Sequence, residues 1–135
     1  MGSQSEIHVV AGAIADAEGR VLIAQRPRGR HMAGRWEFPG GKVGPRESER
    51  EALTRELNEE LGISVTAARQ HMRLRHAYAD REVELSLWII TAYRGDPQPL
   101  DGQRLKWVAP VALPAEDILE ADRPFVEALA RLAPA

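Results

Sequence analysis

Apolar residues recur along the chain in two rhythms, one typical of strands and one typical of helices. Every second residue is apolar over 83–89, which predicts a strand that continues to about Tyr93. Leucine returns every fourth position at Leu53, Leu57 and Leu61, which marks the buried stripe of a helix. Ser48 with Glu51 fits a capping box before that stripe, and Gly62 fits a stop after it, so a helix of about three to four turns is expected.

Shorter apolar runs predict the other elements. Residues 7–15 and 21–24 flank a turn at 16–19 and are expected to pair as a β-hairpin. Further extended segments are predicted at 36–38, at 73–78 as the hairpin partner of the 83–93 strand, and at 105–108, with a break at 39–41 and a closing helix at 124–132. Strands separated by two helices indicate an α+β fold with a mixed β-sheet between helices. The chain has no repeat or linker, so residues 1–135 are expected to form a single domain.

Composition excludes several classes of function. The 18 basic and 20 acidic residues give a net charge of -2, which argues against binding of a nucleic acid polymer. The absence of cysteine excludes a disulfide framework and a thiolate site or nucleophile. The apolar run over 9–14 is too short for a signal sequence or a membrane span, so a cytoplasmic protein without a membrane partner is expected.

Glutamates are crowded over residues 40–63. Glu56, Glu59 and Glu60 fall within a helical sector about 100° wide beside the leucine stripe. Like charges this close call for a counter-ion, and clustered hard oxygen ligands suit Mg²⁺ or Mn²⁺. The alternative is a solvated acidic face with i,i+4 pairs such as Glu51 with Arg55.

The segment before the glutamates favours the metal interpretation. Gly40 and Gly41 allow the backbone to approach a ligand closely. Sixteen of the 18 basic residues are arginine, a side chain whose planar fork pairs with phosphate. Four of them come just before the glycines: Arg26, Arg28, Arg30 and Arg35. Together these features indicate a magnesium-bound polyphosphate.

The same segment resembles the Nudix family. Its box reads G-x5-E-x7-R-E-U-x-E-E-x-G-U, where U is a bulky aliphatic residue. Every specified position is matched, by Gly41, Glu47, Arg55, Glu56, Leu57, Glu59, Glu60, Gly62 and Ile63. The likeness extends over nearly the whole chain to the MutT-type nucleoside triphosphate pyrophosphohydrolases, through "HMAGRWEFPGGK" before the box and "LKWVAPVALP" after it.

The resemblance implies a Nudix fold, an α/β/α sandwich in which the box forms a loop–helix–loop motif. It implies that Arg55 orients a glutamate by a salt bridge and that Glu47 supports the site or a further metal. Asp101 stands where similar proteins place a loop glutamate that reaches the metal. The implied metal ligands are Glu56, Glu59, Glu60, the Gly41 carbonyl and Asp101.

The resemblance also implies the reaction. A water polarised by Mg²⁺, or by Mn²⁺, attacks phosphorus after a glutamate or Asp101 takes its proton, and a nucleoside monophosphate and pyrophosphate are released. The expected role is nucleotide-pool sanitation acting on 8-oxo-dGTP, by a monomer or a homodimer. The residues expected to contact the nucleotide are Arg26, Glu37, Phe38, Gly40, Tyr78 and Asp122. Trp36 and Leu87 are further candidates for a pocket that stacks a base.

The residue at position 122 does not decide which base the substrate carries. MutT proteins selective for 8-oxoguanine carry asparagine there, which donates and accepts, whereas an ionised aspartate only accepts. A broad or cytosine-preferring enzyme (CTP or 5-methyl-dCTP) is therefore an alternative, and Asp122 also fits a helix N-cap. ADP-ribose hydrolases, dinucleoside polyphosphate hydrolases and a non-catalytic Nudix-like base-binding module are the remaining alternatives.

Overall fold

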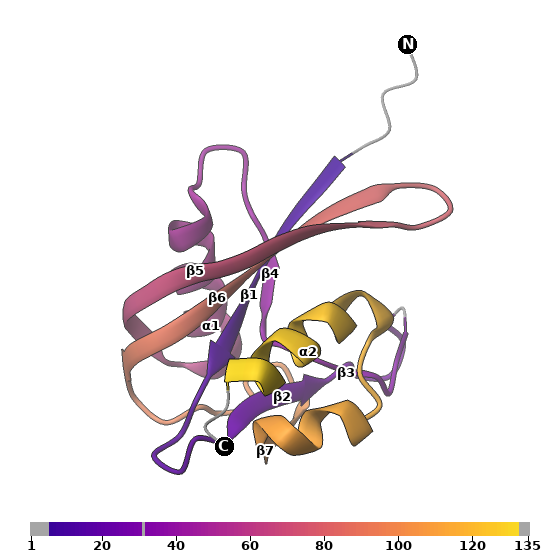
Figure 1. Cartoon of the computed structure of the whole chain (residues 1–135). Helices are drawn as coiled ribbons and strands as arrows, with labels where there is room; N and C mark the ends of the chain where they lie inside the picture. The colour runs from indigo at the N-terminus through magenta and orange to yellow at the C-terminus, as the bar shows by residue number, and fades with distance from the viewer. Residues whose placement is uncertain (1–5, 31, 133–135) are drawn as a thin grey trace.

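Two small sheets lie between two α-helices in the computed structural model, which describes residues 6–30 and 32–132 (Figure 1). The strands are β1 (Glu6–Ile14), β2 (Val21–Gln25), β3 (Trp36–Glu37), β4 (Gly40–Lys42), β5 (Ser64–Ala77), β6 (Glu82–Arg94) and β7 (Arg104–Val108). The helices are α1 (Glu49–Leu61), α2 (Arg123–Leu132) and the 3₁₀ helices η1 (Pro110–Ala115) and η2 (Glu120–Asp122). None of the described helices is both long enough and apolar enough to pass through a bilayer.

The larger sheet has the strand order β4-β1-β6-β5, and the smaller one has the order β3-β2-β7. β1 and β6 are parallel whereas the other pairs are antiparallel, so the predicted mixed sheet is confirmed. The hairpin between 73–78 and 83–93 is also confirmed, although its first strand begins earlier, at Ser64.

The hairpin predicted for 7–15 and 21–24 is wrong. β1 and β2 belong to different sheets and share one isolated bridge, Ala15 with Val21. β1 is occupied on both sides, since Val10 is in register with Gly41 of β4 and with Ser86 of β6. A strand with two filled edges cannot also pair with its neighbour in sequence.

The break predicted at 39–41 holds at Pro39, which lies between β3 and β4, and is wrong at the two glycines, because Gly40–Lys42 forms β4. A Cβ on Gly40 would lie 2.0 Å from the Val10 carbonyl oxygen. Glycine is therefore what lets this short strand press against β1, and it carries the segment that leads into α1.

Helix α1 forms as predicted. Ser48 and Glu51 make the capping box, and Gly62 ends the helix at φ 72°. Its leucine stripe is buried against one side of the sheets, in a cluster that includes Val10 and Ile14.

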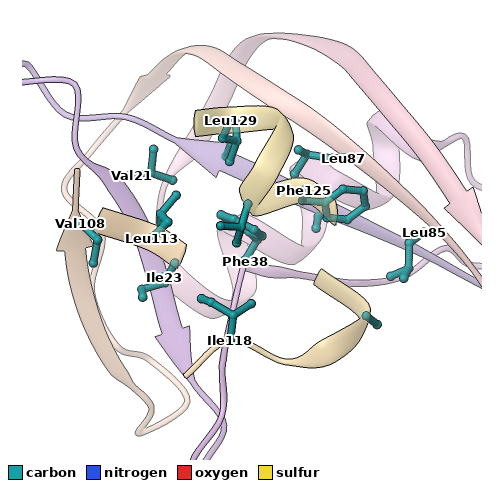
Figure 2. Close-up of a cluster of buried hydrophobic side chains, with 14 of the residues drawn as sticks. Val21, Ile23, Phe38, Leu85, Leu87, Val108, Leu113, Ile118, Phe125 and Leu129 are labelled. Carbon is teal, nitrogen blue, oxygen red and sulfur yellow. The ribbon is translucent and has the colours of Figure 1, made fainter. Parts of the chain in front are cut away.

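Helix α2 covers the other side. Figure 2 shows Phe125 and Leu129 of α2 packed with Phe38, Leu87 and Ile23. The Phe38 and Phe125 rings lie 6.5 Å apart between their centroids. Because neighbouring residues of β1 point into opposite clusters, the α/β/α arrangement is confirmed.

Candidate active site

Arg55, in the middle of α1, holds three glutamates together. Its Nε donates to Glu47 at 2.6 Å, and its Nη1 donates to Glu56 at 2.8 Å and to Glu59 at 3.3 Å. Glu51 serves the capping box instead, so the alternative of a Glu51–Arg55 pair is not what the helix forms. Hydrogen bonds from Arg55 and from the backbone of Gly44 lower the pKa of Glu47 to about 2.

The backbone of β4 meets the acidic face of α1 at the two glycines. A Cβ on Gly41 would lie 2.4 Å from the carboxyl carbon of Glu56, so no side chain fits there while Glu56 keeps its place. The Gly40 N–H donates to Glu60 at 3.2 Å. The loop–helix–loop segment thus brings Glu56 and Glu60 against the start of β4.

Glu60 is short of positive partners. Burial raises its pKa to about 8, and the nearby Glu56, Glu37 and Asp101 carboxylates add to the rise. A half-buried set of oxygen donors with excess negative charge fits a hard divalent cation, so the residues present suit the Mg²⁺ that the resemblance implies.

The carboxylates do not form a complete set of metal ligands. Within the ranges 6–30 and 32–132, no three acidic or histidine side chains stand together as ligands for one ion. Glu59 points outward on Arg55, with its side chain 58% exposed, and Asp101 lies in an exposed loop. Metal binding by Glu56, Glu59, Glu60 and Asp101 therefore stays a prediction.

A cavity of about 270 Å³ opens beside the acidic site. All six residues expected to contact the nucleotide line it: Arg26, Glu37, Phe38, Gly40, Tyr78 and Asp122. Glu60 and Gly41 also line it, so the cavity runs from Asp122 to the acidic helix face. Trp36 and Leu87 do not line it, because Trp36 lies under Lys106 and Leu87 is in the core.

Asp122 and Glu37 place two carboxyl groups in the cavity wall. Asp122 is 4% exposed, and its Oδ2 accepts the N–H of Phe38 at 3.1 Å. Burial raises its pKa to about 7, helped by the nearby Glu37 and opposed by the Phe38 hydrogen bond. Burial also raises the pKa of Glu37, although Arg26 pairs with it at 3.1 Å.

Sequence reasoning missed part of the wall. Arg81 lies over the Tyr78 ring, 5.7 Å from its centroid, and its buried Nε has no hydrogen-bond partner in the described part of the chain. Arg30 lines this cavity and a smaller one of about 40 Å³ next to Asp101. The sequence contained a signal for Arg30, which belongs to the arginine cluster before the glycines, but none for Arg81, which has the sequence position of an ordinary turn residue.

An α/β/α fold whose loop–helix–loop segment sets carboxylates beside a cavity is the arrangement expected of a hydrolase of the Nudix class. The family model described as NUDIX domain matches residues 10–128, and the chain belongs to this family. It is 40% identical over 126 residues to a CTP pyrophosphohydrolase of Escherichia coli K12, covering 93% of each chain. It is 32% identical over 127 residues to the 8-oxo-dGTP diphosphatase of the same organism, covering 94% of this chain and 98% of that one. A solved MutT structure, from work on Aliivibrio salmonicida and Vibrio cholerae, superposes with a TM-score of 0.84 at 33% identity, covering 96% and 100%.

Proposed function

We propose that this Nudix hydrolase cleaves modified nucleoside triphosphates, with 8-oxo-dGTP as the expected substrate, to the nucleoside monophosphate and pyrophosphate. Water hydrolyses the anhydride bond between the α- and β-phosphates. The proposed biological role is nucleotide-pool sanitation. The observation that carries the proposal is one cavity that Asp122, Phe38 and Tyr78 line together with Gly40 and the acidic Glu60.

At the acidic end, Mg²⁺ or Mn²⁺ would be held by Glu56, Glu59, Glu60 and the Gly41 carbonyl. The bound cation would neutralise phosphate oxygens and polarise the attacking water. Arg55 keeps Glu47 and Glu56 in place through its hydrogen bonds of 2.6–2.8 Å. Asp101 would reach the metal from its exposed loop, and it lines the smaller cavity that Gly40 and Glu60 also line.

At the other end, Asp122 would read the base while Phe38 and Tyr78 supply apolar walls. With a pKa of about 7, Asp122 is partly protonated near neutral pH. A protonated carboxyl donates and accepts, as an asparagine does, and can therefore bind the O6 and N1–H edge of an oxidised guanine.

A cytosine nucleotide is the second candidate. The ionised form of Asp122 only accepts, and this suits the amino group of cytosine. The 40% identity to a CTP pyrophosphohydrolase favours the same alternative.

The deciding experiment measures release of the nucleoside monophosphate with Mg²⁺ from 8-oxo-dGTP, dGTP, CTP, 5-methyl-dCTP, dATP, ADP-ribose and diadenosine tetraphosphate, with pyrophosphate as the second product of the triphosphates alone. The control is Glu59→Gln, and a second control adds chelator. We expect the highest kcat/KM with 8-oxo-dGTP and loss of turnover in both controls. A preference for CTP or 5-methyl-dCTP would move the assignment to the second candidate.

Higher kcat/KM with ADP-ribose or the dinucleotide would overturn both assignments. Binding of nucleotides without turnover would identify a base-binding module instead of an enzyme.

A further inference from the structure

Glu49, the first residue of α1, is held by side chains from three strands. Its side chain is 10% exposed. Four groups lie within hydrogen-bonding distance of its two oxygens: His8 Nε2 at 2.7 Å, Arg73 Nη2 at 2.6 Å, Ser86 Oγ at 2.7 Å and Trp88 Nε1 at 2.9 Å. They come from β1, β5 and β6, which are neighbours in the larger sheet.

An acidic residue at a helix N-terminus does not need this many hydrogen-bond donors. An acidic residue in the first turn already interacts favourably with the helix dipole while it remains in water. Burial alone would raise the pKa of Glu49, but hydrogen bonds from Ser86, Trp88, Arg73 and His8 together outweigh it and lower the pKa to about 2. The carboxylate is thus fully supplied with donors inside the protein.

His8 extends the network to the loop in front of the helix. Its carbonyl accepts the N–H of Val43 at 2.9 Å, while its ring meets Glu49. One residue of β1 therefore fastens both ends of the segment 43–49. Glu47 lies within that segment and pairs with Arg55.

Other hydrogen bonds join α1 to β4: Arg55 Nη2 donates to the Lys42 carbonyl at 3.1 Å, and the Gly40 N–H donates to Glu60 at 3.2 Å. The rest of its contacts with the sheets are mainly apolar, through Leu53, Leu57 and Leu61. Such contacts are non-directional, and they fix which face is buried more firmly than they fix the exact rotation or height of a helix. Directed hydrogen bonds to a buried carboxylate do fix both.

We propose that Glu49 is a positioning residue that sets α1 on the sheet and thereby places Arg55 and the acidic face against β4. Its predicted effect on turnover rests on the proposed function. Its effect on the helix and on divalent cation binding can be measured without a nucleotide.

The test compares Glu49→Gln with Glu116→Gln, which removes the Lys106–Glu116 ion pair, whose members lie on β7 and just after η1. Mn²⁺ binding to the metal-free protein, hydrogen exchange of residues 43–60, kcat and KM are measured below the unfolding temperature of each variant. We expect Glu49→Gln to weaken Mn²⁺ binding about fivefold, to speed exchange at 43–49 and to lower kcat about tenfold with KM within twofold. Glu116→Gln is expected to leave all four within twofold, whatever its melting temperature.

Unchanged exchange and unchanged Mn²⁺ affinity in Glu49→Gln would overturn the proposal. If that variant does not fold, His8→Gln and His8→Ala replace it, because glutamine keeps a side-chain donor and alanine does not. His8→Gln should then match the wild-type Mn²⁺ affinity and His8→Ala should not, whereas equal affinities would overturn the proposal. A wild-type protein that binds Mn²⁺ but hydrolyses no nucleotide refutes the proposed function, and the exchange and binding results still decide the role of Glu49.

Discussion

Glu49 and Glu60 stand at opposite ends of the same helix, and they have opposite electrostatic surroundings. Glu49 has four donors, and its pKa is lowered to about 2. Glu60 accepts from the Gly40 N–H, has three acidic neighbours, and its pKa is raised to about 8. The helix dipole adds to the contrast, because it favours a carboxylate in the first turn and disfavours one in the last.

The contrast separates a residue that supports the fold from one suited to bind a ligand. Burial is common to both glutamates, so burial does not distinguish them. What differs is whether the protein itself supplies the donors that a buried carboxylate needs. Where the protein leaves them out, as at Glu60, the carboxylate has room for a cation, and this is the place where the proposed function requires one.

The largest expected effect comes from neutralising Glu60. Glu60→Gln should lower kcat on the best nucleotide about 1,000-fold, or about 4 kcal/mol of activation free energy, because an amide is a poor ligand for a divalent cation. The same change removes repulsion with Glu56 and Asp101, so the melting temperature in chelator should stay equal or rise. Steady-state kinetics and thermal melts check both. A clear fall in melting temperature would mean that Glu60 supports the fold as Glu49 does.

Glu49→Gln should change stability in the opposite direction from Glu60→Gln and destabilise the protein. We expect it to lower the free energy of unfolding at pH 7 by about 2–3 kcal/mol, since an amide donor then stands among the donors of His8, Ser86 and Trp88 where a carboxylate accepted from all of them. The folded pKa of Glu49 lies below its ordinary value of 4.5, so its stabilisation is present above pH 4.5 and is lost as the pH falls toward 2. Urea unfolding at pH 7 and pH 3 should therefore show a smaller difference from wild type at pH 3. Equal losses at both pH values would argue against a charged Glu49 network.

Local signals allowed the acidic half of the site to be predicted. The capping box, the leucine stripe and the stop at Gly62 all lie within one helix, so the sequence contains them in full. The pairing of β1 could not be predicted in this way. Its partners β4 and β6 lie far along the chain, whereas the neighbouring run at 21–24 offered a plausible but wrong hairpin.

The same limit explains what was missed at the site. Glu49 reads as an ordinary acidic residue in a first helical turn, and only the folded sheet brings Arg73, Ser86 and Trp88 to it. The contact of Arg81 with the Tyr78 ring, and its buried Nε without a hydrogen-bond partner among the described residues, are likewise visible only once the turn between β5 and β6 has formed.

Asp122 should behave like Glu60, because burial, helped by the nearby Glu37 and only partly opposed by the hydrogen bond from the Phe38 N–H, raises its pKa to about 7. The folded pKa lies above the ordinary value of 3.8, so the stabilisation is full below pH 3.8 and is lost as the pH rises through 7. Asparagine does not titrate. Relative to wild type, Asp122→Asn should therefore gain about 2 kcal/mol of unfolding free energy between pH 5 and pH 8. If the unfolding free energies of wild type and Asp122→Asn change in parallel over this pH range, Asp122 has the hydrogen-bond donors it needs, as Glu49 does.

The smallest change in stability is expected from Gly41→Ala. Its Cβ would meet only the flexible end of Glu56, at 2.4 Å from the carboxyl carbon, so Glu56 can turn away at a cost of about 1 kcal/mol or less. Turnover should nevertheless fall about tenfold, because Glu56 then leaves Arg55 and the start of β4. Gly40→Ala is the matched contrast, since its Cβ would lie 2.0 Å from the backbone oxygen of Val10 and would push β4 off β1.

Thermal melts and kcat on both alanine variants separate the two roles of neighbouring glycines. Gly40→Ala should lose stability first, and Gly41→Ala should lose activity while it stays folded. If Gly41→Ala is as active as wild type, then turnover does not depend on the position of the Glu56 side chain beside Arg55 and β4. The contrast between the two ends of α1 would in that case rest on Glu60 alone.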